Sequence, residues 1–344
     1  MDPRALQDEE LKARHRITTV TGTSGAAIAY DYKPCQPITM REVAIGGRRD
    51  CRCLARKDNF LFVGVHGGGL AVVDIADPRT SPIIHLLAMP GCELVDFTLA
   101  GDTLYAADFL NGVHAIDVSD PKLPRHIAMH PALTHANNRR VVTNGDVLVL
   151  VNDHAISVFD VSAKQLRPLA LQHRLRTGVG WLRGVVLADK RLYVTQGPMG
   201  LWTFDLSDLA KPRIVDGQEL RLDTRADQRL IIDSLAQLGP RLVAGTSSGI
   251  WSLKLTDAAP ESEAFFTGPG TVREARSQAR DGQLYFAALE PHDHILHIFD
   301  VAEGVRYMGR QRLSRVIERI YDLELGDGYW IGAAGNAGIL FASY

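Results

Sequence analysis

The stretch Gly69-Leu-Ala-Val-Val-Asp-Ile-Ala-Asp-Pro78 decides the fold, because it recurs along the whole chain. Its clearest copies are Gly112-Val-His-Ala-Ile-Asp-Val-Ser-Asp-Pro121, Phe159-Asp-Val-Ser162 and Gly200-Leu-Trp-Thr-Phe-Asp-Leu-Ser-Asp208. Weaker copies are Gly249-Ile-Trp-Ser-Leu-Lys254, Ile298-Phe-Asp-Val301 and Gly338-Ile-Leu-Phe-Ala-Ser343. The aspartate of each copy, or the residue that replaces it, stands 43 to 49 residues after the previous one. Repeats of this length, built from strands, are typical of propeller blades.

One blade can be followed through residues 93–129. Short apolar runs over 93–99, 104–107, 113–118 and 124–129 alternate with turn residues such as Gly101 and Pro121, which predicts four antiparallel strands. The seven marker positions therefore predict an all-β, seven-bladed β-propeller of four-stranded antiparallel blades. The aspartates at 74, 117, 160, 205 and 300 are too regular for catalysis, and we expect each to accept backbone N–H groups of the following turn.

These copies resemble the LVIVD repeat, a family of propeller repeats whose pattern is a glycine, an aliphatic strand ending in Ile-Asp-Val, and then Ser-Asp-Pro. Leu70-Ala-Val-Val-Asp-Ile75 and Val113-His-Ala-Ile-Asp-Val-Ser-Asp-Pro121 match this pattern well. The later copies depart from it, since Lys254 and Ser343 replace the aspartate. The resemblance implies a fold and leaves the function open, because propellers carry many unrelated activities.

The two ends of the chain predict how the propeller closes. Residues 37–45 resemble the outer strands of blades one and two, whereas the chain stops where a third strand ends. We therefore expect residues 37–45 to be the outer strand of the last blade, within a single propeller domain of residues 37–344. Residues 1–36 form an N-terminal extension, in which 3–16 are predicted as a short helix and 17–34 as two short apolar runs joined by a linker turn at 21–25. Residues 171–181 and 220–229 are predicted as long loops before blades four and five.

The first set of candidate site residues aligns where the first strand of each blade begins, nearest the propeller axis. These positions hold Cys53, Asp96, Arg140, Gly184, Ser234, Arg276 and Tyr321. Two guanidinium groups at the mouth of an axial channel would bind a carboxylate or phosphate. We therefore predict Asp96 and Tyr321 as catalytic and Arg140, Arg276 and the adjacent Arg183 as ligand-binding. The alternative is that the arginines pair with Asp96, Glu274 or Glu318 and only seal the channel.

The second set lies in the loops between second and third strands, at the same end of the propeller. His66 and His154 are predicted as acid–base groups, because imidazole titrates near neutral pH. The ligand-binding candidates of this set are Asp108, Asn152, Gln196 and His294. Imidazoles here could also bind a divalent metal, although no pair has the spacing of a metal motif. A solvated loop histidine is the alternative for each, and the strand residues His114 and His126 are expected to be structural.

Composition and motifs exclude several function classes. The chain of 344 residues has 38 basic and 40 acidic residues, which gives no basic stripe for nucleic acid. There is no nucleotide or flavin motif, so no such cofactor is expected. The sequence also has no long apolar run and no leader-like start, so we expect no membrane partner and a cytoplasmic location. The four cysteines, at positions 35, 51, 53 and 92, are then expected as free thiols, with Cys51 and Cys53 on the same face of a strand.

Two kinds of function remain open. The first is a small-molecule site at the channel mouth, which serves a lyase-, isomerase- or hydrolase-type reaction on an anionic substrate. The second is a non-catalytic scaffold that binds a protein partner. A deep polar pocket with perturbed pKa values would favour the first, and an exposed apolar patch the second.

Overall fold

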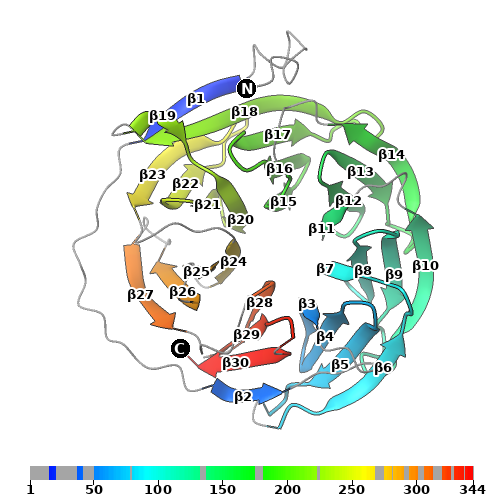
Figure 1. The fold of residues 1–344 in the computed structure, drawn as a ribbon. Coiled ribbons are helices and arrows are strands. Elements are labelled where there is room, and N and C mark those ends of the chain that lie inside the picture. The colour runs from blue at the N-terminus through cyan, green and yellow to red at the C-terminus, as the bar shows by residue number, and fades with distance from the viewer. Residues whose placement is uncertain are drawn as a thin grey trace. The chain divides into compact units, whose positions relative to one another are not determined.

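The structure, a computed structural model, consists of β-strands and connecting turns (Figure 1). It describes residues 15–20, 37–41, 50–77, 80–131, 137–174, 181–222, 225–267, 275–280, 282–289, 294–300, 306–312, 320–326, 329–336 and 338–343. None of these residues belongs to a helix with the length and hydropathy needed to cross a membrane. Contacts divide the chain into a first unit, residues 1–34 and 174–313, and a second unit, residues 35–173 and 314–344.

The second unit contains four sheets of four strands each, and every neighbouring pair with a described register is antiparallel. The first sheet is β3 (Cys51–Lys57), β4 (Phe60–Val65), β5 (Gly69–Asp74) and β6 (Ile83–Ala88). The second is β7 (Leu94–Ala100), β8 (Thr103–Asp108), β9 (Gly112–Asp117) and β10 (Arg125–Pro131), as predicted from residues 93–129. The third is β11 (Asn138–Thr143), β12 (Val147–Asn152), β13 (Ala155–Asp160) and β14 (Arg167–Arg174).

The fourth sheet of this unit joins both chain ends. It contains β28 (Asp322–Leu325), β29 (Tyr329–Ala333), β30 (Ile339–Ser343) and, at its outer edge, β2 (Pro37–Arg41). Strand β2 is antiparallel to β30, with Thr39 opposite Phe341 and Met40 opposite Leu340. The predicted pairing of an N-terminal strand with the C-terminal strand is therefore confirmed.

The first unit contains the remaining sheets. One is β20 (Ile232–Leu238), β21 (Arg241–Thr246), β22 (Gly249–Lys254) and β23 (Glu261–Thr267), and another is β24 (Ala275–Arg280), β25 (Gln283–Leu289), β26 (His294–Asp300) and β27 (Arg306–Arg312). The last has six strands, which are β15 (Val185–Ala188), β16 (Arg191–Thr195), β17 (Leu201–Asp205), β18 (Arg213–Leu222), β19 (Arg225–Arg229) and β1 (His15–Val20).

The prediction of seven four-stranded blades is wrong. Among the described residues there are six four-stranded sheets, and the sheet around β18 has six strands. The cause is the length of β18, whose pairing with β17 ends at Gln218 while the strand continues to Leu222. Its free edge accepts β1 as a parallel strand, and its end pairs with β19 (Figure 1). Most of residues 220–229, predicted as a loop, are therefore strand, and residues 15–16 are strand instead of helix.

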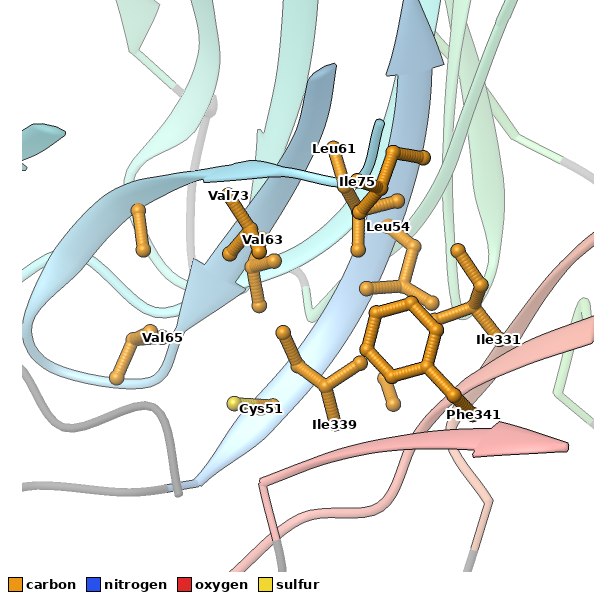
Figure 2. Close-up of a cluster of buried hydrophobic side chains, with 12 residues drawn as sticks. Cys51, Leu54, Leu61, Val63, Val65, Val73, Ile75, Ile331, Ile339 and Phe341 are labelled. Carbon is orange, nitrogen blue, oxygen red and sulfur yellow. The ribbon is translucent and has the colours of Figure 1, made fainter. Parts of the chain in front are cut away.

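Each core cluster of the second unit lies between neighbouring sheets. Figure 2 shows the cluster in which Leu54, Val63 and Val73 of the β3–β6 sheet meet Ile331, Ile339 and Phe341 of the β28–β30 sheet. Sheets that are apolar on both faces explain why their central strands read as continuous hydrophobic runs. Side chains at alternate positions reach opposite neighbours, so one strand supplies two interfaces.

The two buried cysteines of β3 lie in different clusters, which corrects the prediction that they share a face. Cys51 packs in the cluster with Ile339 and Phe341, whereas Cys53 packs with Leu94 and Phe97 of the next sheet. A β-bulge between Cys51 and Cys53 inserts one extra residue and reverses the alternation. Both are free thiols, as is Cys92, while Cys35 lies outside the described residues.

Candidate functional site

A β-bulge recurs where the first strands of the second unit begin. The register shifts between Cys51 and Cys53 in β3, between Leu94 and Asp96 in β7, and between Asn138 and Arg140 in β11. Bulges re-aim the side chain that follows them, and they are common beside functional sites. Three of the aligned candidate positions, Cys53, Asp96 and Arg140, directly follow these bulges.

Asp96 and Arg140 are brought together, and both are largely buried. Arg140 Nη1 donates to Asp96 Oδ1 at 2.9 Å, while the backbone N–H of Val141 donates to Asp96 Oδ2 at 2.8 Å. These bonds join β7 to β11 and therefore tie two sheets together. Arg140 thus pairs with Asp96, as the alternative interpretation of the sequence anticipated.

Asp322 joins this pair, although the sequence analysis did not select it. Its Oδ2 accepts the backbone N–H of Leu54 at 2.9 Å, which ties β28 to β3. Burial, and then the negative charge of Asp96, raise the pKa of Asp322 to about 7, against the lowering effect of Arg140. Burial likewise raises the pKa of Asp96. Asp322 comes directly after Tyr321, and the equivalent residues of two other blades, Leu54 and Val141, are apolar. A charged residue at this normally apolar position was the sequence signal that could have identified Asp322.

The thiol of Cys53 belongs to the same buried group. Burial raises its pKa well above the usual range, and the negative charges of Asp322 and Asp96 add to this effect. A thiol in such surroundings stays protonated and is a poor nucleophile. The buried group therefore offers carboxyl chemistry, and the guanidinium of Arg140 is bonded to one of its two carboxyl groups.

A second, more exposed layer surrounds Tyr321. The guanidinium carbon of Arg52 lies 4.5 Å from the centre of the Tyr321 ring, and Arg52 Nε donates to both oxygens of Asp50 at 2.9 Å. His66 Nε2 lies 3.7 Å from Glu93 Oε1, with both side chains about 30% exposed or less. Of the predicted catalytic residues, His66 and Tyr321 are thus half-buried and placed beside charged groups.

The candidates between second and third strands have local structural roles. Asp108 Oδ1 accepts the backbone N–H groups of Leu110 and Asn111, each at 3.1 Å, and so holds the turn after β8. Asn152 Oδ1 does the same after β12, for His154 at 2.9 Å and Ala155 at 2.7 Å. His154, predicted as catalytic, is exposed at this turn.

The other predicted residues belong to the first unit. Gln196 is buried and its backbone N–H donates to the carbonyl of Gly200. Arg183 Nε lies 3.5 Å from Asp233 Oδ1, and the guanidinium lies 5.6 Å from the centre of the Trp181 ring. Arg276 and His294 lie in β24 and β26, and their side chains are outside the described residues.

One group in the described part of the chain combines side chains that could hold a metal ion. It consists of Cys92, Asp108 and His114, whose ligand atoms lie within 4.8 Å of one another. Only Asp108 was predicted as a site residue, because His114 reads as an ordinary strand position.

Sheets of four strands that follow one another along the chain and pack through apolar faces define the β-propeller class, to which this chain belongs. Residues 49–86 and 95–126 match the family model described as the LVIVD repeat, so the chain carries LVIVD repeats and the predicted resemblance is confirmed. A search of the curated proteins found no match for the sequence.

Two solved structures resemble the chain in fold. The computationally designed Ika8 protein superposes with a TM-score of 0.58 at 10% identity, over 88% of this chain and 99% of that one. The N-terminal domain of Nup159 superposes with a TM-score of 0.57 at 11% identity, over 96% of this chain and 98% of that one. At these identities the similarity concerns the fold alone.

Proposed function

We propose that the second unit binds a small polar molecule where its first strands begin, and that Asp322 exchanges a proton with it. One observation carries this proposal: two buried carboxyl groups, Asp96 and Asp322, lie within the electrostatic influence of the Arg140 guanidinium, which donates to Asp96. A pKa of about 7 for Asp322 suits a general acid or base at neutral pH. The carboxylates of Asp117 and Asp205, which hold turns and pair with a surface arginine, have pKa values of about 2.

The charge balance of this group bears on the ligand. Among the described side chains of this group there are two carboxyl groups and one guanidinium, so the buried part favours a neutral ligand with hydrogen-bonding groups over the anion expected from the arginines alone. Arg52, stacked on Tyr321 and partly exposed, is the cation placed to meet an anionic group of the same ligand. The proposed reaction is a proton transfer of the lyase, isomerase or hydrolase type.

The first test is the pH dependence of stability in Asp322→Asn. The folded pKa of Asp322 is about 7 and the unfolded value is about 3.9, so the unfolded state loses this proton first. The stabilisation is fully present below about pH 4 and is lost as the pH rises toward 7. We expect the free energy of unfolding of the wild type to fall from pH 5 to pH 8, relative to Asp322→Asn. Asp117→Asn is the matched control, because Asp117 titrates well below this range. If the free energy of unfolding changed with pH in the same way for wild type and Asp322→Asn, the raised pKa of Asp322 would be refuted.

The second test is ligand binding, read as thermal shifts with a panel of small neutral and anionic compounds. A compound that raises the Tm of the wild type, but not of Asp322→Asn or Tyr321→Phe, supports the site. If every stabilising compound acts equally on both variants and on Asp117→Asn, the site is not where we place it. Circular dichroism at neutral pH checks that each variant is folded.

A second candidate function is a scaffold that binds an extended protein segment. Strands β6 and β10 form sheet edges and expose apolar side chains: Leu86 is 45% and Met129 48% accessible. Strand β1 already pairs with the edge of β18, so a sheet edge of this chain accepts an added strand.

Extended peptides bind such edges through backbone hydrogen bonds and alternate side chains. Peptides selected by display on the full chain should lose binding with Leu86→Lys or Met129→Lys and keep it with Leu123→Lys, an exposed turn residue. Equal binding by all three variants would exclude these edges.

A further inference from the structure

Three side chains of different chemistry converge at one end of the β7–β10 sheet. Cys92 precedes β7, Asp108 ends β8, and His114 lies in β9. His114 Nε2 lies 3.3 Å from Asp108 Oδ2 and 3.8 Å from Cys92 Sγ. Asp108 and His114 are buried, whereas Cys92 is half-buried.

These separations match the edges of a tetrahedral metal site. Zinc binds nitrogen and oxygen ligands at about 2.0–2.2 Å and thiolate sulfur at about 2.3 Å, so neighbouring ligand atoms lie roughly 3.3–3.6 Å apart. The observed 3.3 Å and 3.8 Å fall close to these values, and all three ligand atoms lie within 4.8 Å of one another. Small side-chain rotations would therefore bring the three donors onto one ion.

The electrostatics of the group favour a cation. Asp108 is charged, because hydrogen bonds from His114 and Asn111 outweigh burial and hold its pKa at about 2. Asp108 accepts hydrogen bonds from N–H groups of Glu93, Leu110, Asn111 and His114, none of which is a permanent cation. Its Oδ2 contacts are also long, at 3.1–3.3 Å, which leaves that oxygen able to bind a metal.

His126 completes the arrangement from the neighbouring strand. His114 Nδ1 lies 3.0 Å from His126 Nε2, so one of the two rings donates a proton to the other. When His114 donates through Nδ1, the lone pair of its Nε2 faces Asp108 and Cys92. A metal-binding histidine is commonly oriented by such a hydrogen bond through its other nitrogen. His126 is exposed and can exchange its own proton with water.

We propose that Cys92, Asp108 and His114 bind a divalent transition metal ion, with zinc as the best match and a fourth position open to water or a ligand. The mixed sulfur, nitrogen and oxygen donors select zinc or cobalt over calcium or magnesium, which prefer oxygen ligands alone. Binding releases the thiol proton of Cys92 to solvent. The Nε2 proton of His114 also leaves to solvent, while His126 passes a proton to His114 Nδ1 and takes one up from solvent, so that the net release is the thiol proton.

The test is cobalt binding to the full chain after treatment with a chelator. We expect one equivalent of Co²⁺ to give the visible bands of tetrahedral cobalt and a near-ultraviolet thiolate-to-cobalt band, both removed by Zn²⁺. Cys92→Ser should abolish the thiolate band, and His114→Gln should weaken cobalt binding at least about 100-fold, since even the loss of an outer partner costs 10- to 100-fold. His85→Gln, in the neighbouring sheet, is the control and should bind as the wild type does.

Two results would overturn the proposal. One is the absence of a thiolate-to-cobalt band in the wild type, in which case the group is a hydrogen-bond network only. The other is an unchanged band in Cys92→Ser, which would assign binding to other cysteines. Circular dichroism excludes unfolding of the variants, and Asp108 is left intact because it also holds the turn after β8. The readout is the metal itself, so its failure is independent of the Asp322 site.

Discussion

At Gly200, just before β17, the surrounding backbone leaves no room for a side chain. Its φ is 90°, and a Cβ added there would overlap the backbone carbonyl of Gln218 in the adjacent strand β18. Gly69 is the equivalent residue of the first copy and has a φ of 118°. A Cβ added there would lie 2.4 Å from the backbone carbonyl oxygen of Leu87. The repeated glycine thus lets the third strand begin close against the fourth.

We expect Gly200→Ala to destabilise the protein by roughly 2–4 kcal/mol, since a strained φ costs about 1–3 kcal/mol and a backbone overlap adds to it. Gly239→Ala is the matched control in the same unit, because its φ is 52° and no atom lies within 4 Å of the added Cβ. It should cost about 1 kcal/mol. Urea unfolding of both variants measures the difference, and equal losses would show that the close approach to Gln218 does not matter.

The role predicted for the repeated aspartate is confirmed at the four positions whose side chains the structure describes, while the side chain of Asp300 lies outside them. Asp74, Asp117, Asp160 and Asp205 each accept the backbone N–H two residues later, at 2.9–3.0 Å. Asp117 and Asp205 also pair with an arginine of the following outer strand, which lowers their pKa values further. This role could be read from the sequence because it involves only residues near in the chain.

At the level of strands, the sequence predicted pairing well and side-chain direction poorly. The strands of residues 93–129 and the pairing of β2 with β30 follow from alternating apolar runs and turn residues. The bulges in β3, β7 and β11 do not, because one extra residue leaves no mark in composition yet reverses the faces of Cys51 and Cys53. Asp322 was missed for a related reason: its partners, Leu54 and Asp96, are distant in sequence.

The tie between β7 and β11 can be separated into its charge and its hydrogen bond. Asp96→Asn keeps an oxygen for the N–H of Val141 and loses the charge opposite Arg140. Asp96→Ala loses both, so we expect it to cost about 3–5 kcal/mol, and Asp96→Asn about 1–3 kcal/mol. Chemical unfolding measures both values.

Asp102→Ala provides the control for a charge that links sheets at the surface. The Asp102 side chain is 49% accessible and accepts from Lys57 Nζ at 2.7 Å, so its loss should change stability little. If Asp96→Ala were as stable as Asp102→Ala, the buried carboxylate would not hold the sheets together.

Across the whole chain, the largest departure from the sequence prediction concerns its first residues. Strand β1 lies in the first unit on β18, whereas β2, only 17 residues further on, lies in the second unit on β30. Residues 15–20 carry no repeat signal, and their parallel pairing depends on the unusual length of β18. A repeat pattern predicts only the strands that belong to the repeat, so it could not reveal this addition.

The closure of the second unit by β2 leads to a prediction that separates the two N-terminal strands. Thr39→Pro combined with Met40→Pro removes two N–H groups from β2, and at least one of them must bond to β30 because donors alternate along an edge strand. Loss of this pairing leaves β30 as the edge strand of its sheet, paired only with β29. The β30 side chains Ile339 and Phe341 fill a core cluster, so this weakens a strand that carries part of the core. We expect a loss of roughly 2–4 kcal/mol and a fall in Tm of several degrees, together with faster proteolysis near the C-terminus. The matched control is Thr18→Pro with Thr19→Pro in β1, which is an additional strand on a sheet that already has four strands without it. This double substitution should therefore cost less stability. If the β1 variant were the less stable of the two, the pairing of β1 with β18 would contribute more to stability than the pairing of β2 with β30, and the prediction would be wrong.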